Sequence, residues 1–462
     1  MTDLIRSCHN LRHAYHAVKA ALPWLDACVC EDDPPAFPRF ARPVRTPHIG
    51  RGKRAPAGMP PILLHTEVDF SAIRERAAAH PDEPLIIESG PRKILYFIED
   101  VMRTFRENTN TYLCTYNFCN WMGIEQLCEA GFGDRLLYGS HMPRYSEDAA
   151  MGPIVMGDLP WELKCGIAGN NLRRLLGQAP VAAPETAFIA PEPFIIDAHT
   201  HNVIPGKPSP MPFPTPDLFF SPADWLCFMD HCALEMILTA PMDAIMDPGS
   251  CSREGCAELH AAAPERFRYF TVFHPKGDDA HVRRVRESLC DPGCVGIKLQ
   301  PSFHKTAADD DAYVPAYKLA REFGKPIMTH SWEVSSYNPV QYLSHPDRFR
   351  KHLKTFPHVT LVLGHAGGRP SALDAVAALC REYPHVRMDL AADYYDNGLI
   401  DNLAATVGVD RILFGSDMNW MDPRCNLAPV LASSLSDDDL LRILRLNAQS
   451  TYLGRGKGAK TT

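Results

Sequence analysis

The sequence predicts an α/β fold in which a parallel (β/α)8 TIM barrel forms the C-terminal part and a degenerate, half-barrel-like α/β domain precedes it. The chain has 462 residues, of which 45% are hydrophobic and 22% are charged, so it can bury a barrel core and a further unit. Beyond residue 193, eight short apolar segments alternate with segments of helical character. No Gly-x-Gly-x-x-Gly turn follows the first segment, which weakens the competing prediction of an open dinucleotide-binding sheet.

The eight expected strands are short and rich in apolar residues. In chain order they are Phe194–His199, Glu235–Ala240, Arg268–Phe273, Val295–Leu299, Pro326–His330, Thr360–His365, Val386–Leu390 and Arg411–Ser416. Helices are expected over Ala316–Phe323, Ser371–Glu382 and Asp437–Leu446. This alternation, over roughly 270 residues, is typical of a closed eight-stranded barrel.

Composition excludes several classes of protein. The formal net charge is −8, whereas nucleic-acid and anionic-membrane binders are more often basic, so we expect neither partner. No apolar run approaches about 18 residues, the length of a membrane-spanning helix. The first residues lack the features of a secretory signal. The 15 cysteines are odd in number and form no C-x-x-C pair, so we expect free thiols in a cytoplasmic protein that acts on a small molecule.

Polar side chains stand at the ends of the predicted strands, where such a barrel carries its active site. The first strand ends in Asp197-Ala-His199-Thr-His201, whose histidines are two residues apart and therefore point to the same side of a strand. Later strand ends carry Lys298, His330, His365 and Asp417. A lone strand-end histidine is usually a core residue, but the six residues in this order together predict a functional site.

This combination of histidine and aspartate is typical of a transition-metal site. Imidazole suits Zn, Fe, Co or Ni better than Mg or Ca. Three histidines and one aspartate can hold one ion and leave a position for water, whose pKa the ion lowers to about 7. A fourth histidine that does not bind the metal can then shuttle the proton.

The segments that carry these residues resemble the amidohydrolase superfamily, and within it the branch of aminocarboxymuconate-semialdehyde decarboxylase. The matching segments are Ile195-Ile-Asp-Ala-His-Thr-His201, Gly296-Ile-Lys-Leu-Gln-Pro301, Pro326-Ile-Met-Thr-His330, Leu363-Gly-His-Ala-Gly-Gly368 and Arg411-Ile-Leu-Phe-Gly-Ser-Asp417. The resemblance covers about residues 190–455. It implies that one divalent metal ion, expected to be Zn with Mn, Fe or Co as alternatives, is bound by His199, His201, His330 and Asp417.

The resemblance also implies the roles of the remaining residues. His365 is expected to be the acid/base residue beside the metal-bound water, and Asp417 both binds the metal and accepts a hydrogen bond from the nucleophile. In superfamily members with two metals the strand-4 lysine is carboxylated and bridges them. One metal is usual in the branch closest to this sequence, so Lys298 is expected to bind a carboxylate of the substrate instead.

These roles imply a metal-dependent hydrolase that cleaves an amide, lactone or ester bond of a small, carboxylated or aromatic molecule. The same branch contains nonoxidative decarboxylases, and the metal ligands alone do not separate the two reactions. A noncatalytic scaffold is the third interpretation, and the complete ligand set argues against it. Trp332, Tyr394 and Tyr395 are candidates for lining the pocket, although packing within their loops explains them equally well.

An internal repeat precedes the barrel. Asp134-Arg-Leu-Leu-Tyr-Gly-Ser-His-Met142 matches Asp410-Arg-Ile-Leu-Phe-Gly-Ser-Asp-Met418 at six of nine positions. Residues 60–178 are therefore predicted to be strands 5 to 8 of a second barrel without strands 1 to 4. In this copy Glu88 is expected at the position of the acid/base histidine and His141 at that of the aspartate. His65, Glu88 and His141 form a weaker metal-site candidate, for which a structural relic is the favoured alternative.

The predicted organisation has four parts: an irregular or helical arm at residues 1–59, the half-barrel at 60–178, a proline-containing linker at 179–192 and the barrel at 193–455. Four strands cannot close a barrel, and an open sheet leaves edges that invite pairing. We therefore expect the half-barrel to pack against the barrel, the arm or a second subunit, the last giving a homodimer.

Overall fold

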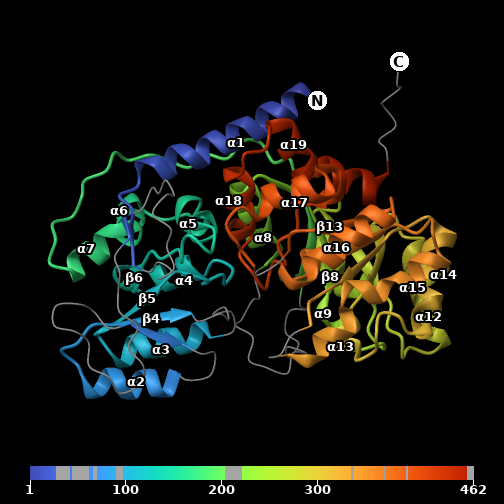
Figure 1. Cartoon of the computed structure of the whole chain (residues 1–462), viewed down its shortest axis with the longest axis horizontal. Coiled ribbons are helices and arrows are strands. Elements are labelled where there is room, and N and C mark those ends of the chain that lie inside the picture. Colours follow the sequence, from blue (N-terminus) through green and yellow to red (C-terminus); the bar gives the residue numbers. More distant parts are fainter. Residues whose placement is uncertain are drawn as a thin grey trace.

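The protein consists of a large barrel and a smaller α/β unit, with one long helix that packs on helices of both (Figure 1). The computed structural model describes residues 1–27, 42–43, 62–65, 70–89, 97–202, 221–334, 338–368, 370–391 and 394–454. Much of the predicted arm lies outside these residues. The part that is described contains helix α1 (Thr2–Ala21) and the short strands β1 (Leu25–Asp26) and β2 (Arg42–Pro43).

The eight predicted barrel strands are confirmed. They are β7 (Ile195–Asn202), β8 (Leu234–Pro241), β9 (Phe267–Val272), β10 (Cys294–Leu299), β11 (Ile327–His330), β12 (Leu361–Gly364), β13 (Val386–Asp389) and β14 (Ile412–Leu413). Each strand pairs in parallel with the next along the chain. Backbone hydrogen bonds close the ring, from Ala198 N to Phe414 O (3.0 Å) and from Asp417 N to His199 O (2.8 Å).

Successive residues of the barrel strands face opposite layers of the core. Ile237, Ile297 and Leu363 belong to one cluster of buried residues, whereas Leu238, Met328 and Val362 belong to a second, separate cluster. Because side chains alternate along a strand, Lys298 and His330 share the face of Met328 and point into the barrel.

Helices cover the outside of the barrel. They are α8 (Pro222–His231), α9 (Met242–Met246), α10 (Ser252–Gly255), α11 (Ala257–Ala262), α12 (Asp279–Leu289), α13 (Pro301–His304), α14 (Val314–Phe323), α15 (Arg350–Thr355), α16 (Pro370–Glu382), α17 (Leu399–Val407), α18 (Pro423–Ala432) and α19 (Asp437–Leu441). Several begin at a side-chain cap, such as Ser221 before α8 and Asp278 before α12. No helix in the described ranges is both long enough and apolar enough to cross a membrane.

The N-terminal sheet is an α/β unit of four parallel strands, β3 (Ile62–His65), β4 (Leu85–Ser89), β5 (Thr111–Cys114) and β6 (Leu136–Leu137), in chain order. Its helices are α2 (Phe70–Ala79), α3 (Ile98–Glu107), α4 (Gly123–Glu129), α5 (Glu147–Val155), α6 (Trp161–Cys165) and α7 (Asn171–Leu175). A π-helical turn at Gly166–Asn170 follows α6, just as one at Arg442–Leu446 follows α19. The smaller α/β unit and the barrel, which are the two copies of the internal repeat, thus share this π-helical turn as well as their strand order.

The smaller copy also contains an equivalent of the first barrel strand, which the sequence comparison missed. Ser140 donates its hydroxyl to Asp26, and its backbone N lies 3.1 Å from Asp26 Oδ1. In the barrel, Ser416 makes the same two bonds to Asp197, at 2.5 Å and 3.1 Å. Ala27 N bonds to Tyr138 O (2.8 Å) as Ala198 N bonds to Phe414 O. Strand β1 therefore lies beside β6 as β7 lies beside the end of β14.

The strand register corrects the predicted position of Glu88. Ile87 pairs with Leu113 in the smaller sheet, and Leu363 pairs with Met388 in the barrel. Leu113 and Met388 in turn pair with the matching residues Leu136 and Ile412. Glu88 consequently matches Gly364, one residue before His365. Its carboxylate forms a short ion pair with His141. The side chain of His65 lies outside the described part of the structure.

The two copies pack together through equivalent helices, α5 and α18, which lie side by side (Figure 1). A Cβ on Gly152 of α5 would lie only 2.3 Å from the carbonyl oxygen of Arg424, so glycine permits this close approach. Helix α1 links the copies. Its Arg12 bonds to Leu431 O (2.9 Å) and Asp437 (3.0 Å) of the barrel, and its Lys19 contacts Asp148 (2.6 Å) of α5.

Candidate metal centre

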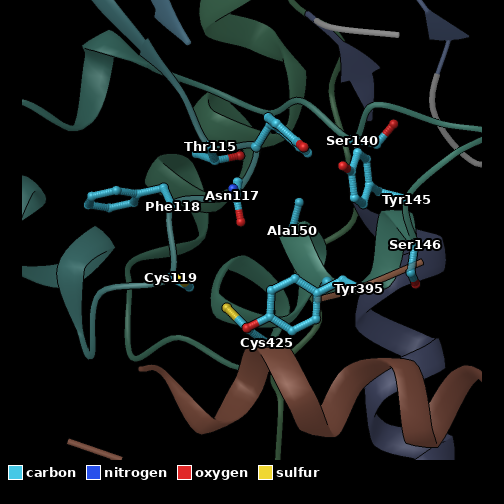
Figure 2. Close-up of a pocket in the computed structure, with 12 residues that line it drawn as sticks. Thr115, Asn117, Phe118, Cys119, Ser140, Tyr145, Ser146, Ala150, Tyr395 and Cys425 are labelled. Carbon is cyan, nitrogen blue, oxygen red and sulfur yellow. The ribbon is translucent and has the colours of Figure 1, made fainter. Parts of the chain in front are cut away.

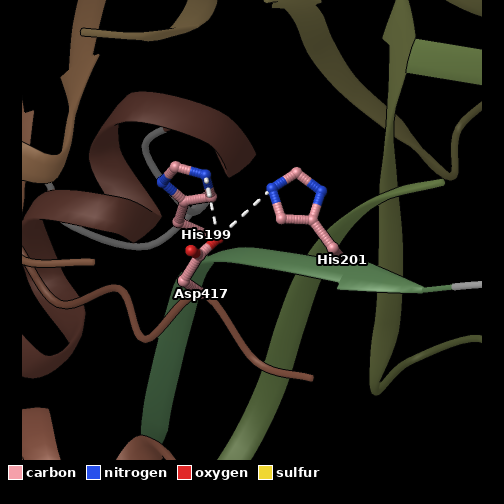
Figure 3. Close-up of side chains that lie close together, drawn as sticks. All are labelled: His199, His201 and Asp417. Atoms are coloured by element: carbon pink, nitrogen blue, oxygen red, sulfur yellow. Dashed lines mark ion pairs between the residues drawn. The ribbon is translucent and has the colours of Figure 1, made fainter. Parts of the chain in front are cut away.

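Two histidines and one aspartate converge at the mouth of the barrel. His199 and His201 lie near the end of β7, and Asp417 follows β14 (Figure 3). Oδ1 of Asp417 lies 3.3 Å from Nε2 of His201 and 3.8 Å from Nε2 of His199. The potential ligand atoms of the three residues all lie within 4.8 Å of one another. The donor set fits a transition-metal ion.

The other ring nitrogen of each histidine is already engaged. Nδ1 of His199 bonds to Asp389 Oδ2 (2.9 Å), and Nδ1 of His201 bonds to the carbonyl of Ala240 (2.9 Å). A nitrogen that donates to an oxygen carries the proton, so Nε2 of each ring carries the lone pair that a metal would use. On His199 this lone pair faces Nζ of Lys298 (3.0 Å) in the structure, a contact that a metal would replace. Burial lowers the pKa of both histidines well below the usual value, and the cation of Lys298 adds to this effect. Both rings are therefore neutral, as metal ligation requires.

Glycines make room for the His199 ring. A Cβ on Gly364 would lie 2.9 Å from Cε1 of His199 and 2.8 Å from the carbonyl oxygen of Thr329. A Cβ on Gly415 would lie 2.9 Å from Cβ of His199. All three distances are below ordinary van der Waals contact, so a larger residue at Gly364 or Gly415 would displace the His199 ring or the neighbouring strand.

Asp197 and Ser416 fix the strand ends that carry the ligands. The Asp197 carboxylate accepts hydrogen bonds from the backbone N of His199 (3.2 Å) and of Ser416 (3.1 Å). The Asp197 carboxylate thereby connects the part of β7 that carries His199 to the segment between β14 and Asp417. Burial raises the pKa of Asp197 to about 7, against the lowering effect of these hydrogen bonds.

The remaining predicted residues surround this group. His365 packs against both His199 and His330, with ring centroids 4.7 Å apart in each case. Nε2 of His330 bonds to Gln341 Oε1 (2.8 Å), and its ring stacks on Trp332. Lys298 is fully buried, and its Nζ lies 3.0 Å from Nε2 of His199 and 3.0 Å from Sδ of Met328. The structure therefore brings His199, His201 and Asp417 closest together, with His330, His365 and Lys298 around them.

The residues that form this site lie within a region that matches a known family. A family model described as Amidohydrolase matches residues 196–453, more than half of the chain. The chain belongs to the amidohydrolase family. It is an enzyme of the amidohydrolase superfamily, and the expected resemblance is confirmed. No curated protein matches this amidohydrolase.

Solved structures similar to this amidohydrolase match just over half of the chain at low identity. The 2,6-dihydroxybenzoate decarboxylase from Rhizobium is 15% identical and covers 56% of this chain and 98% of its own, with a TM-score of 0.44. A 5-carboxyvanillate decarboxylase from Novosphingobium aromaticivorans, complexed with manganese, is 12% identical (56% and 95%, TM-score 0.42). The 4-oxalomesaconate hydratase from Rhodopseudomonas palustris is 19% identical (56% and 96%, TM-score 0.42).

The sequence did not assign a role to Asp389, the last residue of β13. Its Oδ2 bonds to His199, and its Oδ1 accepts hydrogen bonds from the backbone N of His365 (2.9 Å) and of Ala391 (3.1 Å). The side chain is fully buried, and burial raises its pKa. The one signal in the sequence was its position at the end of the seventh predicted strand of the amidohydrolase barrel.

Proposed function

We propose that this amidohydrolase is a metal-dependent hydrolase that cleaves an amide, lactone or ester bond of a small molecule. The observation that carries the proposal is the convergence of two histidine Nε2 atoms on one aspartate oxygen, with both Nδ1 atoms already engaged. When bound at this position, a divalent metal supplies a water molecule that is ionised near neutral pH. We propose a single ion, with zinc expected.

His365 is proposed as the residue that moves the proton. Its Nδ1 forms a short hydrogen bond to the carbonyl of Ala391, so Nδ1 carries the proton and Nε2 can accept one. Burial, together with the neighbouring His199, lowers the pKa of His365 well below the usual value. A neutral imidazole in this position is suited to act as a general base.

The roles of Lys298 and His330 are also proposals. Because Lys298 contacts His199 at the bottom of the site, a substrate carboxylate that it binds would have to reach deep into the barrel. His330 would have to exchange its hydrogen bond with Gln341 for the metal in order to serve as the fourth ligand. A carboxylated Lys298 that bridges two metals is the alternative to its role in substrate binding.

The burial of the site supports a small substrate. Only 16% of the Asp417 side chain is exposed, and His201, His330 and His365 are buried. Trp332 packs edge-on against His365, with ring centroids 5.3 Å apart, and is a candidate contact for an aromatic ring. A small carboxylated or aromatic molecule can reach side chains buried to this extent more readily than a polymer can.

The test separates hydrolysis from decarboxylation. The zinc-loaded enzyme is incubated in ¹⁸O-labelled water with panels of small amides, lactones, esters and aromatic carboxylic acids. Hydrolysis places one labelled oxygen in the product, and His365→Gln lowers kcat by about 10²- to 10⁴-fold. Release of CO2 with no labelled oxygen in the organic product would replace our proposal with a decarboxylase. Failure to bind any transition metal would favour the noncatalytic scaffold.

We further propose that the enzyme acts in the cytoplasm and as a homodimer. The dimer proposal rests on β3, whose outer side pairs with no strand among the described residues and can pair with a second chain. Light scattering of the purified protein tests it, and a mass equal to one chain would contradict it.

A further inference from the structure

A hollow lies at the seam between the two copies, and none of the described residues that line it belongs to the metal centre. It is lined by residues that follow β5, by residues that follow β6, by helix α5 and by two residues of the barrel, Tyr395 and Cys425 (Figure 2). Because β5 and β6 correspond to β13 and β14, the hollow lies at the carboxyl ends of strands, the edge on which such barrels carry their sites.

The walls of the hollow are held by both copies. The backbone N of Ser146 donates to Tyr395 O (2.6 Å), and Asn397 N donates to Arg144 O (3.0 Å). On the neighbouring side of the seam, Asp422 N donates to Cys119 O (2.8 Å). The hollow is therefore fixed by hydrogen bonds across the seam and is not a gap between independently moving parts.

Thr115 supplies an unused polar group to this hollow. The residue is 2% exposed and lines the opening that Asn117, Tyr145, Ala150 and Tyr395 also surround (Figure 2). Its Oγ1 is buried and has no hydrogen-bond partner among the described residues. A buried hydroxyl without a partner has lost its hydrogen bonds to water, so a bound molecule that accepts or donates a hydrogen bond here restores one.

The lining determines the chemical class of that molecule. It combines aromatic rings (Tyr116, Phe118, Tyr145 and Tyr395) with hydroxyl and amide groups and the small side chains of Ala149 and Ala150. Among the described residues that line it there is no aspartate, glutamate, lysine, arginine or histidine. A charged ligand would lose its hydration without gaining an ion pair, whereas an uncharged ring with a hydroxyl group can stack and hydrogen-bond.

We propose that the seam between the two copies is a second ligand site, which binds a small, uncharged aromatic compound that carries a hydroxyl group. The ring lies among Tyr116, Tyr145 and Tyr395, and its hydroxyl group pairs with Thr115. The site is separate from the metal centre, and the proposal does not depend on the reaction catalysed there.

Calorimetric titration of the metal-loaded, full-length protein with phenol tests the proposal. Phenol binds at the seam, and benzoate, the same ring with a charge, binds there at least about tenfold more weakly. Thr115→Val, which keeps the shape of the side chain, weakens phenol binding by about 3- to 10-fold. The thermal stability of the Thr115→Val variant is unchanged or raised, because the substitution removes a hydroxyl that has no hydrogen-bond partner among the described residues. Ala150→Phe fills the hollow and abolishes phenol binding at the seam.

Thr111→Val is the matched control. Thr111 is also buried, as the first residue of β5, but its Oγ1 donates to Asn108 O (2.8 Å), so its loss lowers stability and leaves phenol binding unchanged. Phenol affinity that is equal in the wild type, Thr115→Val and Ala150→Phe would place phenol elsewhere and overturn the proposal. Absence of phenol binding to the folded wild type would overturn it as well.

Discussion

Asp389 acts on two site residues at once. One carboxylate oxygen accepts the Nδ1–H of His199, and the other accepts the backbone N–H of His365. The carboxylate therefore fixes both the tautomer of a metal ligand and the position of the proposed base. It is a positioning residue, since it need not touch substrate or metal.

We predict that Asp389→Asn lowers metal affinity about 10- to 100-fold, as is typical for a residue that orients a metal ligand. An asparagine can turn its NH2 group toward Nδ1 of His199, which moves the ring proton to Nε2 and blocks ligation. Competition with a chelator of known affinity measures the change. Asp374→Asn, at an exposed position of α16, is the control. Equal affinities in the two variants would contradict the role of Asp389.

At the scale of elements, a buried ion cluster joins α4 of the smaller copy to the start of α18 in the barrel. Arg424, at the start of α18, forms a short ion pair with Glu125 of α4 and a second one, at 2.6 Å, with Asp422. All three side chains are buried. Burial disfavours the charge on Arg424, but the two carboxylates more than compensate and raise its pKa.

We predict that Arg424→Met lowers the free energy of unfolding by about 3–5 kcal/mol, because two carboxylates remain buried without a cation. Arg442→Met removes a comparable pair with Asp410 (2.8 Å) that is exposed to solvent, and should cost at most about 1 kcal/mol. Thermal or urea unfolding of both variants measures the difference. Similar losses in the two variants would show that the cluster does not hold the seam.

A second element-scale prediction concerns pH. Lys164 of α6 is buried, and its Nζ donates to Val155 O (2.9 Å). Burial, with the Arg424 charge, lowers its pKa to about 8. Between about pH 8 and pH 10 the unfolded chain then binds more protons at this residue than the folded one, so the wild type gains stability as pH rises. Relative to Lys164→Met, we expect a gain on the order of 2 kcal/mol. The free energy of unfolding of the wild type relative to Lys164→Met is measured at pH 7.5 and at pH 9.5. Equal differences at the two pH values would contradict this prediction.

Sequence comparison found the strand order of the smaller copy but missed its first strand. The segment Asp26-Ala-Cys28-Val-Cys30 matches Asp197-Ala-His199-Thr-His201 only at its first two positions, because cysteines replace the histidines. The match emerges from the paired bonds of Asp26 to Ser140 and of Asp197 to Ser416. Cys28 and Cys30 themselves lie outside the described residues.

For the whole molecule, metal binding and folding should be linked. The ligands come from β7 and from the segment after β14, which lie at opposite ends of the barrel sequence, so a bound ion joins them. Any ion that binds only the folded state stabilises it, by about 2.7 kcal/mol at one hundred times its dissociation constant.

We therefore predict that a chelator lowers the melting temperature of the wild type and that added zinc restores it. His201→Ala should show neither response, since it lacks one ligand. Differential scanning calorimetry with and without chelator measures both, with metal content checked by elemental analysis. A chelator response that persists in His201→Ala would contradict the ligand assignment.

The sequence by itself determined the eight barrel strands and the polar residues at their ends, because alternating burial and strand-end position are local properties of the chain. Only the tertiary structure decided which of these residues meet. In the folded chain Asp389 hydrogen-bonds to His199, and Gln341 hydrogen-bonds to His330. Lys298 is buried, and Thr115 lines the hollow between the two copies. Each of these depends on contacts between residues far apart in the chain, whose geometry the closure of the barrel and the packing of the two copies set.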